Sequence, residues 1–235
     1  MGNDVVLARR AFLGGAAALL LAGAPLARAA EGRVVAVFGD SLADGLWAGL
    51  QGGVAQEAGL RLVRLGTVGN GLTRAGWRDW VTGKAAEARA KGADSAIVML
   101  GANDVQGLRD DQRRTWALAS EGWDREYGAR AEFVIGAFRE AGCASVAWVG
   151  LPVMRDAEAE RAARHCDEVD AAAAARAGAR FVDISKEFRA ADGRWTASVP
   201  SGPHKGAALR AEDGVHFSGL GYRLMAEAAW RGLSA

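Results

Sequence analysis

Short apolar runs alternate with longer amphipathic stretches along most of the chain. The apolar runs have the length and composition of buried strands and occupy residues 33–38, 61–65, 95–100, 145–149 and 180–182. The stretches between them have helical length and cover residues 46–58, 77–90, 127–141 and 157–177, and a last helix is expected over 219–230. This alternation predicts an α/β fold, a three-layer α/β/α sandwich around a five-stranded parallel sheet.

Polar and glycine-rich segments lie next to the predicted elements. Three of them follow the first three predicted strands, and the fourth precedes the last helix: Gly39-Asp40-Ser41, Gly69-Asn70-Gly71, Gly101-Ala102-Asn103-Asp104 and Asp213-Gly214-Val215-His216. Ligands of open α/β sheets bind outside the carboxyl ends of the strands. We therefore expect these four segments to meet at one edge of the sheet.

The composition is that of an ordinary folded domain. Of the 235 residues, 50% are hydrophobic and 24% are charged, and 29 basic residues nearly balance 28 acidic ones. This balance excludes a disordered chain and argues against nucleic acid as a partner. The length left after an export signal suits one domain of roughly 200 residues.

The N-terminal segment has the features of an export signal. Arg9-Arg10 stands before Phe12-Leu13, an apolar stretch over residues 14–26 follows, and Ala27-Arg28-Ala29 offers small residues for cleavage. We interpret residues 1–29 as a twin-arginine-like signal peptide and residues 30–235 as a single domain. The Sec route and an uncleaved anchor are alternatives. We expect a periplasmic or secreted protein that meets the export machinery and is not stably inserted in the membrane after signal removal.

Cysteine and histidine spacing gives no sign of a metal centre. Cys143 and Cys166 could pair in an oxidising compartment, and two buried free thiols fit the sequence equally well. Neither a Cys-x-x-Cys nor a His-x-x-x-His pair is present. We expect neither a metal nor another cofactor.

Ser41 stands where the first strand turns into a helix. A serine at such a turn is pushed out of the sheet plane, and the helix amides face whatever it attacks. A hydroxyl needs an adjacent base that a third group holds, and the three-residue gap puts Asp213 and His216 on one side of a turn. The pattern predicts a serine hydrolase. Alternatively, Gly39-Asp40-Ser41 is only a helix N-cap.

In this order, the four segments resemble the sequence blocks of the SGNH (GDSL-type) hydrolases, and the resemblance runs from Val34 to the last helix. It implies the flavodoxin-like fold of that superfamily. It also implies that Ser41 is the nucleophile, that His216 is the general base and later the acid, and that Asp213 orients the imidazole.

The resemblance also implies an oxyanion hole. Its donors would be the side-chain amide of Asn103 and the backbone amides of Ser41 and of a glycine in the second loop. The strand register favours Gly71, and Gly69 is close enough to substitute for it. We expect a glycine there because the backbone must approach the substrate without a Cβ in the way.

These inferences predict a serine esterase that acts through an acyl-enzyme on small acyl esters, chiefly acetyl esters, of carbohydrate or cell-wall glycan. The alternatives are an O-acetyltransferase with the same acyl-enzyme, a lipase or thioesterase, and a catalytically silent glycan-binding module. Among the neighbouring residues, Asp40 and Asp104 are expected to cap or brace their loops, and His165 to lie on the surface. His204 and Arg155 are candidates for substrate contact.

Overall fold

The computed structural model describes Met1 and residues 32–234. The predicted signal peptide therefore lies outside the described residues, apart from Met1. Five parallel strands form one sheet in the order β2-β1-β3-β6-β7. Their bounds are β1 Val34–Gly39, β2 Arg61–Gly66, β3 Ser95–Met99, β6 Ser145–Val149 and β7 Arg180–Val182.

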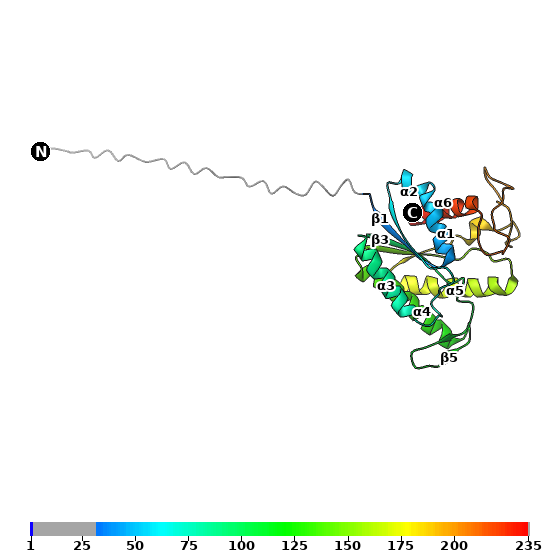
Figure 1. The fold of residues 1–235 in the computed structure, drawn as a ribbon, viewed down its shortest axis with the longest axis horizontal. Helices are drawn as coiled ribbons and strands as arrows, with labels where there is room; N and C mark the ends of the chain where they lie inside the picture. Colours follow the sequence, from blue (N-terminus) through cyan, green and yellow to red (C-terminus); the bar gives the residue numbers. More distant parts are fainter. Residues whose placement is uncertain (2–31, 235) are drawn as a thin grey trace. The chain divides into compact units, whose positions relative to one another are not determined.

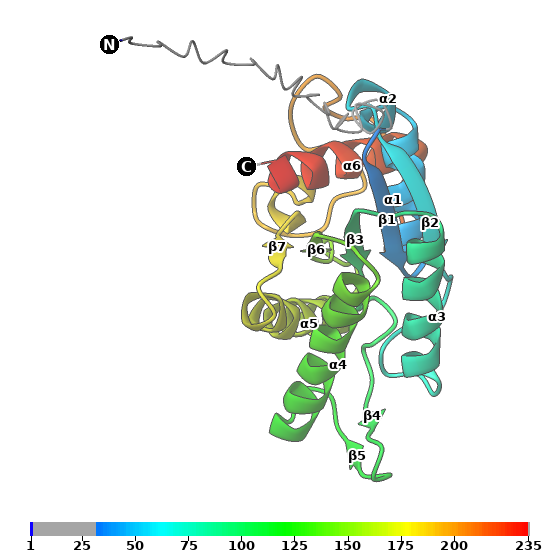
Figure 2. The same ribbon diagram turned by 90° about the vertical axis from the view of Figure 1, so that its left-hand side faces the viewer.

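Helices cover both faces of this sheet, which confirms the predicted three-layer α/β/α sandwich. Figure 1 shows α1 (Ser41–Gln51) and α6 (Gly219–Ser234) on one side of the sheet. On the other side lie α3 (Trp77–Ala90), α4 (Glu121–Glu140) and α5 (Ala157–Arg176), and the view in Figure 2 agrees. The short elements are α2 (Val54–Glu57), the 3₁₀-helix η2 (Ser185–Phe188), and the two-stranded antiparallel pair of β4 (Leu108–Arg109) with β5 (Thr115–Trp116).

The burial of the central strands explains why their sequences are almost entirely apolar. Every residue of β1 and of β3 is buried, because helices pack on both faces of these strands. Phe38 of β1 contacts the rings of Trp80 and Phe138, with ring centroids 4.6 and 5.1 Å apart. These contacts form part of the core between the sheet and α3 and α4.

Two predicted helices begin earlier in the structure than the sequence suggested. The helix expected over 46–58 starts at Ser41, because the Asp40 carboxylate accepts the Leu42 amide at 2.8 Å and caps it, and Gly52-Gly53 separates α1 from α2. The helix expected from residue 127 starts at Glu121, where the Ser120 hydroxyl accepts the Trp123 amide at 3.3 Å. In both cases the capping residue extends the helix beyond its apolar stripe.

Helices α1 and α6 approach each other closely through a strip of small residues. Gly45 and Gly49 lie one and two turns after Ser41 and share its face of α1. A Cβ at Gly45 would lie 2.0 Å from the Tyr222 ring, and one at Gly49 would lie 2.1 Å from the Tyr222 carbonyl oxygen. This close packing brings the segment just before α6 to the N-terminus of α1.

Candidate active site

Ser41 is the first residue of α1, immediately after the carboxyl end of β1. Its neighbour Asp40 is fully buried and caps the helix, so Ser41 is held at the helix end. First-turn amides have no acceptor within their own helix. The serine hydroxyl and these amides therefore share one edge of the sheet, a suitable place for a group that becomes negatively charged.

His216 connects Ser41 to Asp213. The His216 Nε2 atom lies 2.8 Å from Ser41 Oγ, and its Nδ1 atom lies 2.6 Å from Asp213 Oδ2. The other carboxylate oxygen of Asp213 accepts the backbone amides of Val215 and His216 at 2.8 and 2.9 Å. Serine, imidazole and carboxylate thus form one hydrogen-bonded chain, in which the imidazole can take a proton from Ser41 while the carboxylate holds it.

Asp213 is ionised throughout the range in which an imidazole titrates. Partial burial opposes its charge, but the hydrogen bonds from His216 and from the Val215 amide prevail and lower the pKa of Asp213 to about 2. The His216 side chain is 36% exposed and that of Asp213 is 50% exposed. The chain of three residues therefore lies open to solvent at the surface.

The structure places Asn103 between the first and second loops. Its Nδ2 atom donates to the Asn70 carbonyl at 3.0 Å and to Asp40 Oδ2 at 3.3 Å. The Gly71 amide donates to the Asn70 side chain at 3.0 Å. Asn103 and the loop that holds Gly71 are therefore in direct contact. The longer bond, to Asp40, is the one that an incoming oxyanion would most easily replace.

The glycine requirement at position 71 has a different physical cause from the one expected. A Cβ there would lie 2.4 Å from Asp104 Oδ1, so the space is taken by a carboxylate and not kept for substrate. Gly69 is exposed, and a Cβ there would meet nothing within 4 Å. Gly71 as the oxyanion donor, with Gly69 as its substitute, stays a prediction.

Asp104 braces the second loop. It is fully buried and accepts the Leu72 amide at 3.0 Å, the Thr73 amide and hydroxyl at 2.8 Å each, and the Tyr127 hydroxyl at 3.1 Å. These bonds tie the loop after β2 to α4. Asp104 thus supports the backbone around Gly71.

Asp40 has an environment unlike that of Asp213. Burial raises the pKa of Asp40 to about 7, and the Leu42 amide only partly opposes this. Because the Asp40 carboxyl contacts Asn103, its protonation state changes the charge next to the predicted oxyanion hole.

Three residues next to His216 were not singled out for this role by the sequence. Arg210 is buried and donates to the backbone carbonyls of residues 214–216. Arg155 reaches the same turn from the loop after β6, with its amide 3.2 Å from the Gly214 carbonyl and its Nη1 2.7 Å from that of Glu212. The Trp195 ring contacts both guanidinium groups. An arginine directly after the apolar stretch Ala207-Ala208-Leu209 was the available signal for Arg210.

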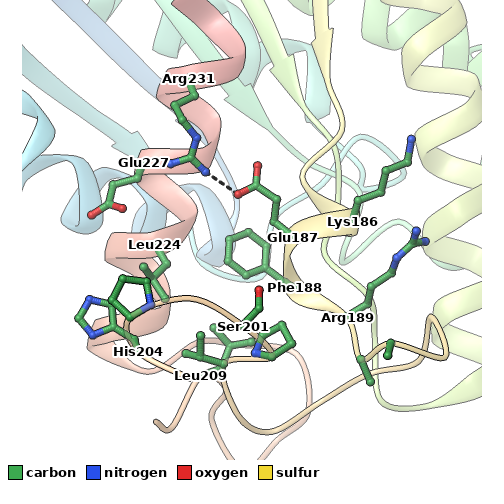
Figure 3. Close-up of a pocket in the computed structure, with 15 residues that line it drawn as sticks. Lys186, Glu187, Phe188, Arg189, Ser201, His204, Leu209, Leu224, Glu227 and Arg231 are labelled. Carbon is green, nitrogen blue, oxygen red and sulfur yellow. Dashed lines mark hydrogen bonds and ion pairs between the residues drawn. The ribbon is translucent and has the colours of Figure 1, made fainter. Parts of the chain in front are cut away.

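His204 lines a separate cavity of about 610 Å³ formed by η2, α6 and the loop over 199–209. Figure 3 shows this cavity, with the ion pair of Arg231 and Glu187 beside it. None of Ser41, Asn103, Asp213 and His216 lines it. His165 is partly buried and bonds to Asp124 at 2.7 Å, so the expected surface histidine is a structural contact between α5 and α4.

Cys143 and Cys166 are free thiols and are both buried. Burial raises the pKa of Cys143 to about 11. Within residues 32–234, no cluster of three or more histidine, cysteine, aspartate or glutamate side chains is arranged to hold a metal ion. In the same part of the chain, no helix combines the length and the hydropathy of a membrane span.

Residues 34–231 match a family model described as a protein of unknown function, DUF459. No curated protein matches the sequence.

The fold is similar to that of several solved structures. A protein from Slackia heliotrinireducens that is assigned to the SGNH hydrolases is 17% identical, with a TM-score of 0.60 over 86% of this chain and 99% of that chain. An acetylxylan esterase from Geobacillus stearothermophilus is 20% identical, with a TM-score of 0.58 over 87% and 95%. A carbohydrate acetylesterase from Sinorhizobium meliloti is 14% identical, with a TM-score of 0.58 over 86% and 98%.

Proposed function

The chain belongs to the DUF459 family and has the fold of the SGNH hydrolases, and from this premise we propose that it is a serine esterase that removes acetyl or similarly small acyl groups from carbohydrate. The observation that carries the proposal is the hydrogen-bonded chain from Ser41 through His216 to Asp213. If Ser41 belonged only to a helix cap, its hydroxyl would need no hydrogen bond to His216, and His216 would need none to Asp213.

In the first half-reaction, Ser41 Oγ attacks the carbonyl carbon of the ester while His216 Nε2 takes the hydroxyl proton. The carbonyl oxygen becomes an oxyanion, which the Asn103 side chain and the amides of Ser41 and Gly71 would stabilise. His216 then gives its proton to the alkoxide oxygen of the sugar as the carbon–oxygen bond breaks. The products are a free sugar hydroxyl and an acyl group on Ser41.

In the second half-reaction, water attacks the acyl carbon and gives a proton to His216. The tetrahedral intermediate collapses, the bond to Ser41 breaks, and His216 returns the proton to Ser41 Oγ. The acid leaves and the enzyme is restored. Asp213 stays ionised throughout, because its pKa of about 2 is far below neutrality, and it stabilises the imidazolium that forms twice in each cycle.

The choice of carbohydrate esters has two supports. The exposed His216 and Asp213 side chains leave the site open to an ester carried on a bulky substrate. Two of the structurally similar proteins act on acetylated carbohydrate according to their descriptions.

A substrate comparison tests this proposal. We expect the protein to release acetate from acetylated xylo-oligosaccharides and to cleave p-nitrophenyl acetate faster than the decanoate, because an open site offers no apolar tunnel for a long chain. Acetate release is measured enzymatically, and the sugar product by mass spectrometry. Faster cleavage of the decanoate would favour a lipase. Transfer of acetyl to an added sugar in preference to water would favour an acetyltransferase.

Replacing Asn103 with alanine should lower kcat for p-nitrophenyl acetate by about 10²- to 10³-fold, since removal of one oxyanion donor has an effect of that size. KM should change little, because the ground-state carbonyl carries less charge than the oxyanion. Steady-state kinetics provide the test. The matched control is Gln112→Ala, which removes an exposed amide side chain between β4 and β5 and should leave kcat unchanged. A kcat within twofold of wild type for Asn103→Ala would remove Asn103 from the oxyanion hole.

A further inference from the structure

Four backbone carbonyls of the segment that ends in His216, those of Glu212, Gly214, Val215 and His216, accept hydrogen bonds from two arginines. We call residues 212–216 the base turn. Arg210 Nη2 lies 2.9 Å from the Val215 carbonyl oxygen and 3.4 Å from that of Gly214, and its Nε lies 3.3 Å from that of His216. Arg155 holds the carbonyls of Glu212 and Gly214. The main chain of the base turn is therefore held by two arginines, while the His216 side chain extends to Ser41.

Arg210 is an unusual cation. It is only 6% exposed, and no carboxylate of the described residues forms an ion pair with it. Burial lowers the pKa of Arg210 to about 10, so its guanidinium stays charged at neutral pH. A buried charge without an ionic partner is costly unless other groups solvate it. Here the aligned carbonyl dipoles of three successive residues take that role.

Aromatic rings hold both arginines in place. The Arg210 guanidinium carbon lies 4.1 Å from the centroid of the Phe217 ring and 5.9 Å from that of Trp195. The Arg155 guanidinium carbon lies 5.6 Å from the same Trp195 ring. Flat guanidinium groups stack well on aromatic faces, which an ammonium group cannot do. The stack restricts the directions in which the arginines can donate hydrogen bonds.

Movement of the base turn would directly affect the chemistry. Asp213 bonds to the amides of Val215 and His216, so carboxylate, turn and imidazole move as one unit. A shift of this unit would change the 2.8 Å separation of His216 Nε2 and Ser41 Oγ. Displacements of about 1 Å at a reacting group can cost about 100-fold in rate.

We propose that Arg210 is a positioning residue for His216: its guanidinium, stacked on Phe217 and Trp195, fixes the base turn so that the imidazole meets both Ser41 and Asp213. The role of His216 as a base rests on the proposed esterase function, whereas the claim that Arg210 fixes the position of the imidazole does not. Arg155 and Trp195 also support the turn. Five donors in a rigid plane allow one arginine to reach three carbonyls, so lysine would be a poor replacement.

The first measurement needs no turnover. The protein contains three histidines, so ¹⁵N-histidine labelling gives a simple spectrum, in which loss of a signal in His216→Ala assigns the His216 Nδ1 proton. A proton in a 2.6 Å bond to a carboxylate should be strongly deshielded. In Arg210→Ala we expect this signal to broaden or disappear through faster exchange with water. In Arg231→Ala, which removes an exposed arginine at the far end of α6, it should persist.

The second measurement is kinetic. Arg210→Ala should lower kcat for p-nitrophenyl acetate by about 10- to 100-fold with KM within about threefold, because the binding surface stays while the imidazole is misplaced. Guanidinium chloride at low millimolar concentration should restore part of kcat by entering the space left by the side chain. Arg210→Lys should lose activity although it keeps the charge. Arg231→Ala should be unaffected and show no rescue.

Circular dichroism first establishes that each variant is folded. If Arg210→Ala is not folded, the same two measurements on Arg210→Lys decide whether the proposal holds. An unchanged His216 signal in a folded Arg210 variant overturns the proposal, whether or not kcat falls. A kcat within twofold of wild type also overturns it. If the wild-type protein cleaves no ester, the proposed function has failed, and the His216 signal alone still decides whether Arg210 positions the imidazole.

Discussion

Replacing Ser41 with alanine is expected to lower kcat for p-nitrophenyl acetate by at least about 10⁴-fold. Without Oγ no acyl-enzyme can form, and only the catalysis left to the oxyanion donors and to binding remains. Stopped-flow absorbance measures the rate. Mass spectrometry of acid-quenched protein should find an added acetyl group on wild type and none on Ser41→Ala.

Ser201→Ala is the matched control. Ser201 is an exposed serine that lines the cavity in Figure 3, and its replacement removes the same hydroxyl at a site that none of Ser41, Asp213 and His216 lines. Its kcat should equal that of wild type. If Ser41→Ala instead kept the wild-type rate, or if the acetyl group were found on another residue, Ser41 would not be the nucleophile.

The second large effect is expected for Asp213→Asn, with a fall in kcat of about 10⁴-fold and a KM within about threefold. An amide at this position can donate its N–H to Nδ1 of the imidazole, which would leave Nε2 protonated and unable to accept the Ser41 proton. The pKa of Asp213 is about 2, so the wild-type carboxylate is ionised at every pH at which the enzyme would be assayed. No change in the charge of Asp213 occurs between about pH 5 and 9, so the loss should be seen across that whole range, which a pH series can measure.

Asp192→Asn serves as the control for this substitution. Asp192 is an exposed carboxylate paired with Arg194, and hydrogen bonds from Arg194 lower its pKa, so the same chemical change is made away from the imidazole. Its rate should match that of wild type. Equal rates for wild type and Asp213→Asn would mean that Asp213 does not orient His216.

The strands were the most predictable part of the fold. In a sheet buried on both faces, strands such as β1 and β3 must be apolar throughout, so composition alone marks them. Helix starts were harder to predict. The first turn of α1 includes Ser41 and Asp44, which break the apolar stripe, so the helix was expected only from residue 46 although Asp40 was expected to cap or brace its loop.

The sheet topology also explains why several residues of the candidate site could be predicted from the sequence. Segments that follow parallel strands share one edge, so Ser41 and Asn103 were expected near each other before any distance was known. Arg210 could not be recognised in the same way. Its function depends on the carbonyl directions of the base turn and on two aromatic rings, Phe217 and Trp195, and no sequence spacing encodes such directions.

The close fit of α6 against Gly45 and Gly49 has a consequence for biosynthesis. Ser41 and His216 are 175 positions apart, and the imidazole reaches the hydroxyl only when α6 has docked on α1. A growing polypeptide on the ribosome therefore carries an ordinary, unreactive alcohol at position 41 until the final helix has emerged. Truncation before that helix would yield a product that contains all five strands of the sheet and has no acyl-transfer chemistry.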